Sequence, residues 1–168
     1  AVDSSKFNIA PKDKKLESEL GFEGKVVIGY IGSFVEYEGL DLLLEACSIL
    51  KEKHGDIFRL LLVGDGDTMQ LLRRTARFLQ LEDQVVFTGR IPHDDVQRYY
   101  SLIDIAPLPR KGLRVCELVS PLKPFEAMGA GKVLITSSVQ ALAEIVEDGV
   151  TGMIFEKDNS EDLAIKLE

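Results

Sequence analysis

Residues 26–64 run VVIGYIGSFVEYEGLDLLLEACSILKEKHGDIFRLLLVG and contain the pattern that repeats along the chain. It begins and ends with apolar, strand-forming runs, Val26–Gly32 and Phe58–Gly64. Between them, Leu40–Lys53 has the apolar spacing of a helix with one buried face. That face carries Leu40, Leu43, Leu44, Cys47 and Leu50. The stretch therefore predicts a strand–helix–strand unit.

The same alternation continues to the end of the chain. Further strands are predicted at Val85–Gly89, Asp104–Leu108, Val133–Ser137 and Gly152–Phe155. Helices are predicted at Thr68–Leu79, His93–Leu102, Lys123–Met128, Ala141–Val146 and Ser160–Glu168. The strands are continuous apolar runs, as expected when both faces of a sheet are buried. The predicted fold class is α/β, a Rossmann-like doubly wound parallel sheet of about six strands with helices on both faces.

The length of 168 residues suits one domain and is too short for two. Residues 1–21 are polar and contain Pro11, so we expect an interdomain linker there. Residues 22–168 would form the domain itself. The last predicted helix reaches Glu168 without a stop signal, so we expect the sequence to be part of a longer chain.

Composition excludes some functions. The net charge of −8 and the pI near 4.9 argue against nucleic acid as a partner, because a phosphate backbone requires a basic surface. No run of 18 apolar residues and no apolar signal-peptide core occur in the sequence. We therefore predict a cytoplasmic domain, with any peripheral contact to the inner membrane face made by other parts of a longer protein. No spacing typical of metal ligands is present.

In an open α/β sheet, ligands bind beyond the carboxyl ends of the strands. One loop at that edge, Gly64-Asp65-Gly66-Asp67, begins like a dinucleotide fingerprint but has Met69 where the third glycine belongs. Two carboxylates there would also compete with a pyrophosphate for the helix start. We interpret the loop as a tight turn with Asp67 capping the following helix.

Residues 109–131, PRKGLRVCELVSPLKPFEAMGAG, are the richest in candidate chemistry. Four cations occur there: Arg110, Lys111, Arg114 and Lys123. The stretch also holds a helix start at Leu122, and free amides together with cations suit a diphosphate. Glu126, one turn inside that helix, suits a ribose diol. A solvated loop followed by an ordinary helix with a surface glutamate is the alternative interpretation.

Several segments, in this order, resemble the C-terminal domain of the group 1 glycosyltransferases, retaining enzymes of GT-B fold. They are GYIGSFVEYEGLDLLLEA, LLLVGDG, VVFTGRIPHDDVQRYYSLIDIAPLP, SPLKPFEAMGAGKVLITSSV and EIVEDGVTGMIF. The resemblance implies a two-domain enzyme in which this half binds a nucleotide-sugar donor. The N-terminal domain, absent from this sequence, would bring the acceptor. It also implies that no metal and no other cofactor is required.

The resemblance implies roles for individual donor-binding residues. Glu126 matches the second glutamate of the family's E-x7-E motif, which binds the ribose. Leu122 matches the helix start whose amides meet the phosphates. Arg90 and Ile91 match the segment that lines the nucleobase, and Gly32 matches the glycine that passes close to the phosphates.

The sequence departs from the family at three positions. The first glutamate of E-x7-E falls at Leu118, and the neighbouring Glu117 would substitute only if the loop shifts. The phosphate-binding arginine falls at Ser33, and the lysine before Gly39 falls at Glu38. We therefore hypothesise that the four cations Arg110, Lys111, Arg114 and Lys123 replace the two lost charges.

The sequence favours a glycosyltransferase donor domain that transfers a sugar, with retention, to a glycan or lipid-linked saccharide. No catalytic base is assigned, and we expect this fragment alone to be inactive. Three alternatives stay open. They are a non-catalytic nucleotide-sugar-binding module, a sugar-nucleotide epimerase and an NAD-binding Rossmann domain.

Overall fold

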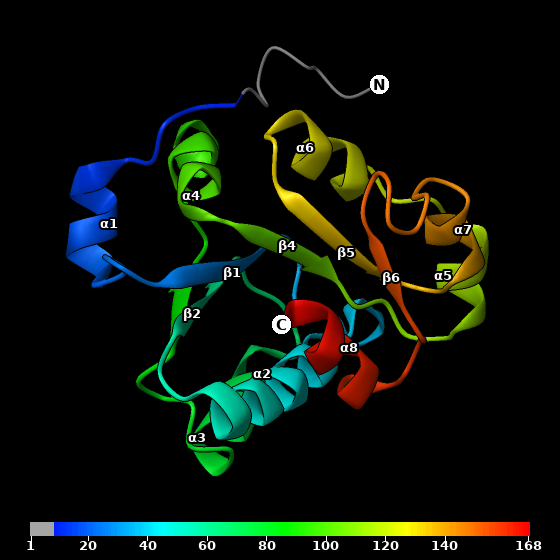
Figure 1. The fold of residues 1–168 in the computed structure, drawn as a ribbon, viewed down its shortest axis with the longest axis horizontal. Helices are drawn as coiled ribbons and strands as arrows, with labels where there is room; N and C mark the ends of the chain where they lie inside the picture. Colours follow the sequence, from blue (N-terminus) through cyan, green and yellow to red (C-terminus); the bar gives the residue numbers. More distant parts are fainter. Residues whose placement is uncertain (1–8) are drawn as a thin grey trace.

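The computed structural model describes residues 9–168, which form a six-stranded sheet in the order β3-β2-β1-β4-β5-β6 (Figure 1). The strands are β1 (Val26–Ile31), β2 (Phe58–Val63), β3 (Val85–Gly89), β4 (Ile105–Leu108), β5 (Val133–Ser137) and β6 (Met153–Phe155). Every named pair of neighbouring strands is parallel. The sheet is therefore doubly wound, with its order reversing between β1 and β4, and the predicted fold class is confirmed.

Helices cover both faces of this sheet (Figure 1). One face carries α2 (Leu40–His54), α3 (Met69–Phe78) and α8 (Ser160–Leu167). The other carries α1 (Lys14–Leu20), α4 (Val96–Leu102), α6 (Lys123–Gly129) and α7 (Gln140–Ala143). The short α5 (Arg114–Leu118) lies beside α7 at the β6 end of the sheet.

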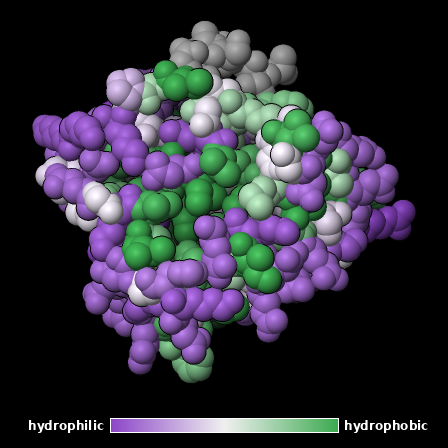
Figure 2. Space-filling view, in the orientation of Figure 1, coloured by the Kyte–Doolittle hydropathy of each residue, from purple (hydrophilic) through white to green (hydrophobic). Residues whose placement is uncertain are grey.

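The central strands form the core because helices close over them on both sides. Leu60, Leu61 and Leu62, consecutive in β2, are all fully buried. Consecutive buried residues point to opposite faces of a strand, so neither face of β2 meets water. In the view of Figure 2, hydrophilic side chains surround an apolar area near the middle of the molecule.

The structure adds a helix to the segment expected as a linker and a 3-10 turn to one expected helix, and it corrects two expectations, an uninterrupted loop at residues 109–121 and a helix cap at Asp67. Within the segment expected as a linker, residues 1–8 lie outside the described part, but Lys14–Leu20 is a helix. A second short helix, α5, interrupts the expected loop. The helix expected from His93 begins with a 3-10 turn, η3 (His93–Asp95). Thr68, not Asp67, is the N-cap residue of α3, and it makes no side-chain capping bond.

Candidate donor-binding site

The carboxyl ends of β1, β2 and β3 are packed tightly against one another by glycines. The Gly32 amide donates to the Val63 carbonyl at 3.0 Å, and the Gly64 amide donates to the Gly89 carbonyl at 3.1 Å. A side chain on Gly64 would place its Cβ only 1.9 Å from the Gly32 carbonyl oxygen. Glycine therefore lets the three strand ends pack closely, and they form the floor of the hollow described next.

Above this floor lies a hollow of about 300 Å³. It brings together four of the expected donor-binding residues, Gly32, Ser33, Arg90 and Ile91. The remaining lining comes from Ile31, Val63, Gly64, Asp65 and Val96. Aliphatic side chains next to exposed backbone suit a flat base bound beside polar groups.

Lys123 lies directly against the first loop, residues 32–39 after β1. A Cβ on Gly32 would be 2.5 Å from Lys123 Cε, so only glycine lets the lysine pack there. The Lys123 Nζ is 5.6 Å from the centroid of the Tyr30 ring and 3.8 Å from Glu38 Oε1. Tyr30 also fixes the loop, because its hydroxyl donates to the Ser33 carbonyl at 2.9 Å.

The start of α6 offers fewer amides than an ordinary helix start. Its N-cap residue, Leu122, makes no side-chain capping bond. The amides of Phe125 and Glu126 already donate to the Leu122 carbonyl. Pro124, between them and Lys123, has no N–H. The start of α6 therefore has few free amides to offer a phosphate, and the Lys123 ammonium is the main positive group beside it.

Glu126 is half-buried on α6 and faces α4. Its Oε2 accepts a hydrogen bond from the Tyr100 hydroxyl at 3.3 Å. Burial, together with the Glu126 charge, raises the pKa of Tyr100 well above its usual value, so this tyrosine stays a donor. Tyr100 was not among the expected site residues.

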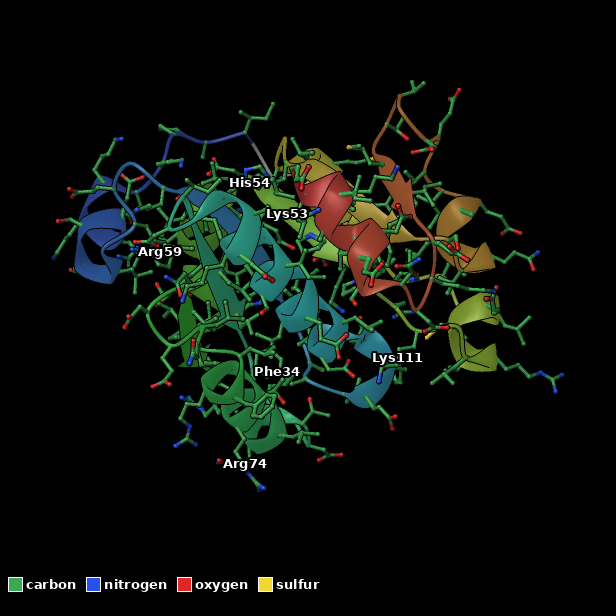
Figure 3. All side chains as sticks on the ribbon, turned by 60° about the horizontal axis from the view of Figure 1, so that its bottom comes forward. Phe34, Lys53, His54, Arg59, Arg74 and Lys111 are labelled. Carbon is green, nitrogen blue, oxygen red and sulfur yellow. The ribbon has the colours of Figure 1, made fainter. Side chains whose placement is uncertain are left out.

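The four cations of residues 109–131 do not converge on one point. Lys111 is turned toward α2, where its Nζ lies 3.0 Å from Asp41 Oδ2 and 3.8 Å from Glu36 Oε1 (Figure 3). Arg114 begins α5 and is exposed. The expected cluster is therefore not formed, and only Arg110 and Lys123 share a partner, Glu38.

Within residues 9–168, His, Cys, Asp and Glu side chains nowhere gather in a group of three that could hold a metal ion. None of the helices in the same part of the chain has the length and apolar character that a bilayer crossing requires.

Residues 25–168 match the family described as Glycosyl transferases group 1. The chain belongs to the group 1 glycosyltransferases. It is 26% identical over 167 residues to the amylovoran biosynthesis glycosyltransferase AmsK of Erwinia amylovora, covering 99% of this chain and 41% of that protein. It is 27% identical over 158 residues to a GDP-mannose-dependent phosphatidylinositol monomannoside mannosyltransferase of Mycolicibacterium smegmatis, covering 91% of this chain and 41% of that one. The chain thus spans about two-fifths of the length of these curated relatives.

Solved glycosyltransferase structures share the fold. The C-terminal domain of the group 1 protein LpcC from Francisella tularensis superposes with a TM-score of 0.82 at 22% identity, covering 99% of this chain and 86% of that one. Anabaena HepE in complex with UDP-glucose gives 0.84 at 23% identity, covering 98% and 44%.

In this chain, Glu38 occupies the position where the family resemblance implies a lysine. Its side chain is 3% exposed, and its Oε1 accepts from Arg110 Nη2 at 3.1 Å. Arg110 is itself buried, donates to the Val119 carbonyl at 3.1 Å and lies over the Tyr37 ring. Removing one member of such a buried pair destabilises a protein by about 3–5 kcal/mol. Arg110 is thus held by Glu38 and is not a free cation at the carboxyl-end edge of the sheet.

Glu117 was considered as a substitute for the missing first glutamate at Leu118. Its Oε2 accepts from the Gln140 amide at 2.7 Å, and its Oε1 lies 2.6 Å from Lys157 Nζ. The hydrogen bond from Lys157 holds the pKa of Glu117 below its usual value. Both oxygens therefore join α5 to α7 and to the segment before α8, and Leu118 is exposed.

Proposed function

We propose that this chain is the donor-binding part of a glycosyltransferase that moves a sugar from a nucleoside diphosphate to an acceptor. The observation that carries the proposal is the single hollow that joins Gly32, Ser33, Arg90 and Ile91, with Lys123 packed against Gly32 beside it. The apolar part of the hollow suits the base. The diphosphate would then lie over the first loop, within reach of the lysine.

The chemistry of this site would be electrostatic. Charge that develops on the leaving diphosphate would be stabilised by the Lys123 ammonium and by loop amides. Glu126 would accept hydrogen bonds from the ribose diol, with Tyr100 fixing one of its oxygens. Transfer would retain the anomeric configuration and would need no metal and no other cofactor.

The acceptor, a glycan or a lipid-linked saccharide, would be brought by a second domain of a longer protein. Two features support a second domain: the curated relatives are longer than this chain, and large apolar side chains are exposed in the segment that leads into α6. They are Leu113, Val115, Leu118, Val119, Leu122 and Phe125, each 45–67% exposed. Exposed apolar groups on this scale mark an interaction surface. We place the whole enzyme in the cytoplasm, with any membrane contact made elsewhere in the longer protein.

One observation favours a second candidate function. Ser33 and the buried Glu38 stand where the family resemblance implies an arginine and a lysine. A module that binds the nucleotide sugar without catalysis would need less stabilisation of the leaving group. Sugar transfer by the longer protein distinguishes the glycosyltransferase from the non-catalytic module, because the module would bind the donor and transfer no sugar.

Calorimetric titration of the 168-residue chain with UDP-glucose, GDP-mannose and ADP-glucose tests donor binding. We expect one of them to bind, and Lys123→Ala to weaken it about 10–100-fold, because a charge-assisted hydrogen bond contributes about 1.5–3 kcal/mol. Lys15→Ala, which removes an exposed lysine on α1, is the control and should change nothing. Equal donor affinity in all three proteins, or no binding by any, would contradict the proposal.

A further inference from the structure

The charge cluster at Glu38 has an unusual composition for the rim of an anion site. Glu38 is buried, and its Oε1 faces Arg110 at 3.1 Å and Lys123 at 3.8 Å. Its Oε2 is also buried and has no hydrogen-bond partner within residues 9–168. The side chains of Arg110, Lys123 and Glu38 together carry one net positive charge. A lysine at position 38, as the family resemblance implies, would make this cluster more positive.

The two cations differ in how firmly they are held. Arg110 is fixed by Glu38, by the Val119 carbonyl and by the Tyr37 ring. Lys123 is 23% exposed, and its contacts to Glu38 and to the Tyr30 ring are long. An anion above Gly32 would therefore meet Lys123 first and would compete with Glu38 for it.

The position of the carboxylate is fixed by the backbone. Glu38 ends the 3-10 turn η2 (Glu36–Glu38), and Gly39 follows with φ +74°. A Cβ on Gly39 would be 1.9 Å from the Pro109 carbonyl oxygen. The Lys111 amide also donates to the Tyr37 carbonyl at 3.0 Å. The first loop and the fourth loop, residues 109–121 after β4, are thus locked together, which fixes the backbone that carries Glu38.

We propose that Glu38 is a positioning residue that holds Lys123 over the first loop and keeps the affinity for free nucleoside diphosphate low. Low affinity for this product would let it leave after transfer. The inference rests on the proposed function. Because the carboxylate is buried, solvent screens its effect on a bound diphosphate only weakly.

Three isosteric variants of the 168-residue chain test the inference by changing the charge of the cluster in steps. Glu38→Gln leaves two net positive charges, Arg110→Gln leaves none, and the double variant restores one. Each is titrated with UDP, GDP and ADP, and with uridine, guanosine and adenosine as neutral controls, while circular dichroism confirms folding.

For the diphosphate that binds, we expect Glu38→Gln to bind about five- to tenfold more tightly and Arg110→Gln to bind more weakly by a similar factor. The double variant should bind as the natural sequence does, and affinity for the nucleoside should stay constant throughout. Adding Lys123→Met to Glu38→Gln should abolish the gain. If one single variant fails to fold, the other and the double variant still give the test.

A purely structural ion pair would change the thermal midpoint of the variants but would alter diphosphate and nucleoside affinity alike. Diphosphate affinity that does not follow the net charge overturns the inference and leaves the proposed function standing. Failure of the natural sequence to bind any diphosphate or nucleotide sugar would overturn both.

Discussion

Two glycines with nearly the same backbone show what single residues contribute. Gly39 has φ +74° and ψ +25°, and Gly21 has φ +72° and ψ +32°. A Cβ on Gly21 would meet nothing within 4 Å, whereas on Gly39 it would collide with the Pro109 carbonyl. We expect Gly21→Ala to lower the free energy of unfolding by about 1 kcal/mol through backbone strain alone.

Gly39→Ala should lower the free energy of unfolding by at least about 2 kcal/mol more than Gly21→Ala, because the first and fourth loops must separate. Urea denaturation of both variants measures the difference. Equal losses of unfolding free energy in the two variants would mean that the two loops separate without cost. The contact between the loops would then not fix the position of Glu38.

The position of Gly32, Ser33, Arg90 and Ile91 directly after strands is visible in the sequence, and the structure lines one hollow with all four. Their role in donor binding, which the family resemblance implies, stays a prediction. The inward turn of Arg110 is not visible in the sequence, because its partner Glu38 lies in another loop, and a loop arginine is ordinarily exposed.

At the scale of elements, Glu117 attaches α5 to α7, and this attachment depends on pH. The pKa of Glu117 is lowered, chiefly by the hydrogen bond from Lys157. A carboxyl group whose pKa is lower in the folded than in the unfolded protein stabilises the fold fully when the pH is above the ordinary pKa of 4.5. This stabilisation is lost as the pH falls through the pKa of the folded state.

We therefore expect Glu117→Gln to lower the thermal midpoint at pH 7, and to lower it by less as the pH falls below 4.5. Glu45→Gln, on the exposed face of α2, is the control and should show no such dependence. A difference between Glu117→Gln and the natural sequence that stays constant between pH 7 and pH 3 would contradict this assignment.

Most elements were predictable, whereas two short helices, α1 and α5, were not. Strands such as β1 are uninterrupted apolar runs, which give a signal independent of context. By contrast, α1 is short and highly charged, and its stability comes from tertiary contacts: Asp13 caps it and also bonds Arg98 at 2.8 Å. Five residues form α5, too few for any periodicity to appear.

At the scale of the whole molecule, we propose that this chain forms half of an active site. The hollow and Lys123 would bind a donor, and a further domain would cover the exposed apolar side chains at residues 113–125. We expect the 168-residue chain to bind nucleotide sugar without transferring the sugar to any acceptor, as measured by release of nucleoside diphosphate. Acceptor-dependent release by this chain alone would show that the site is complete without a partner.

NMR titration of the ¹⁵N-labelled chain shows, amide by amide, whether the carboxyl-end edge of the sheet binds a nucleoside-diphosphate sugar. With UDP-glucose, GDP-mannose or ADP-glucose, we predict that amide signals of Gly32, Ser33, Arg90, Ile91 and Lys123 shift in a saturable manner. Shifts confined to the separate hollow around Val35, Asp41 and Leu71, or a response to NADH with none to any nucleotide sugar, would contradict the account.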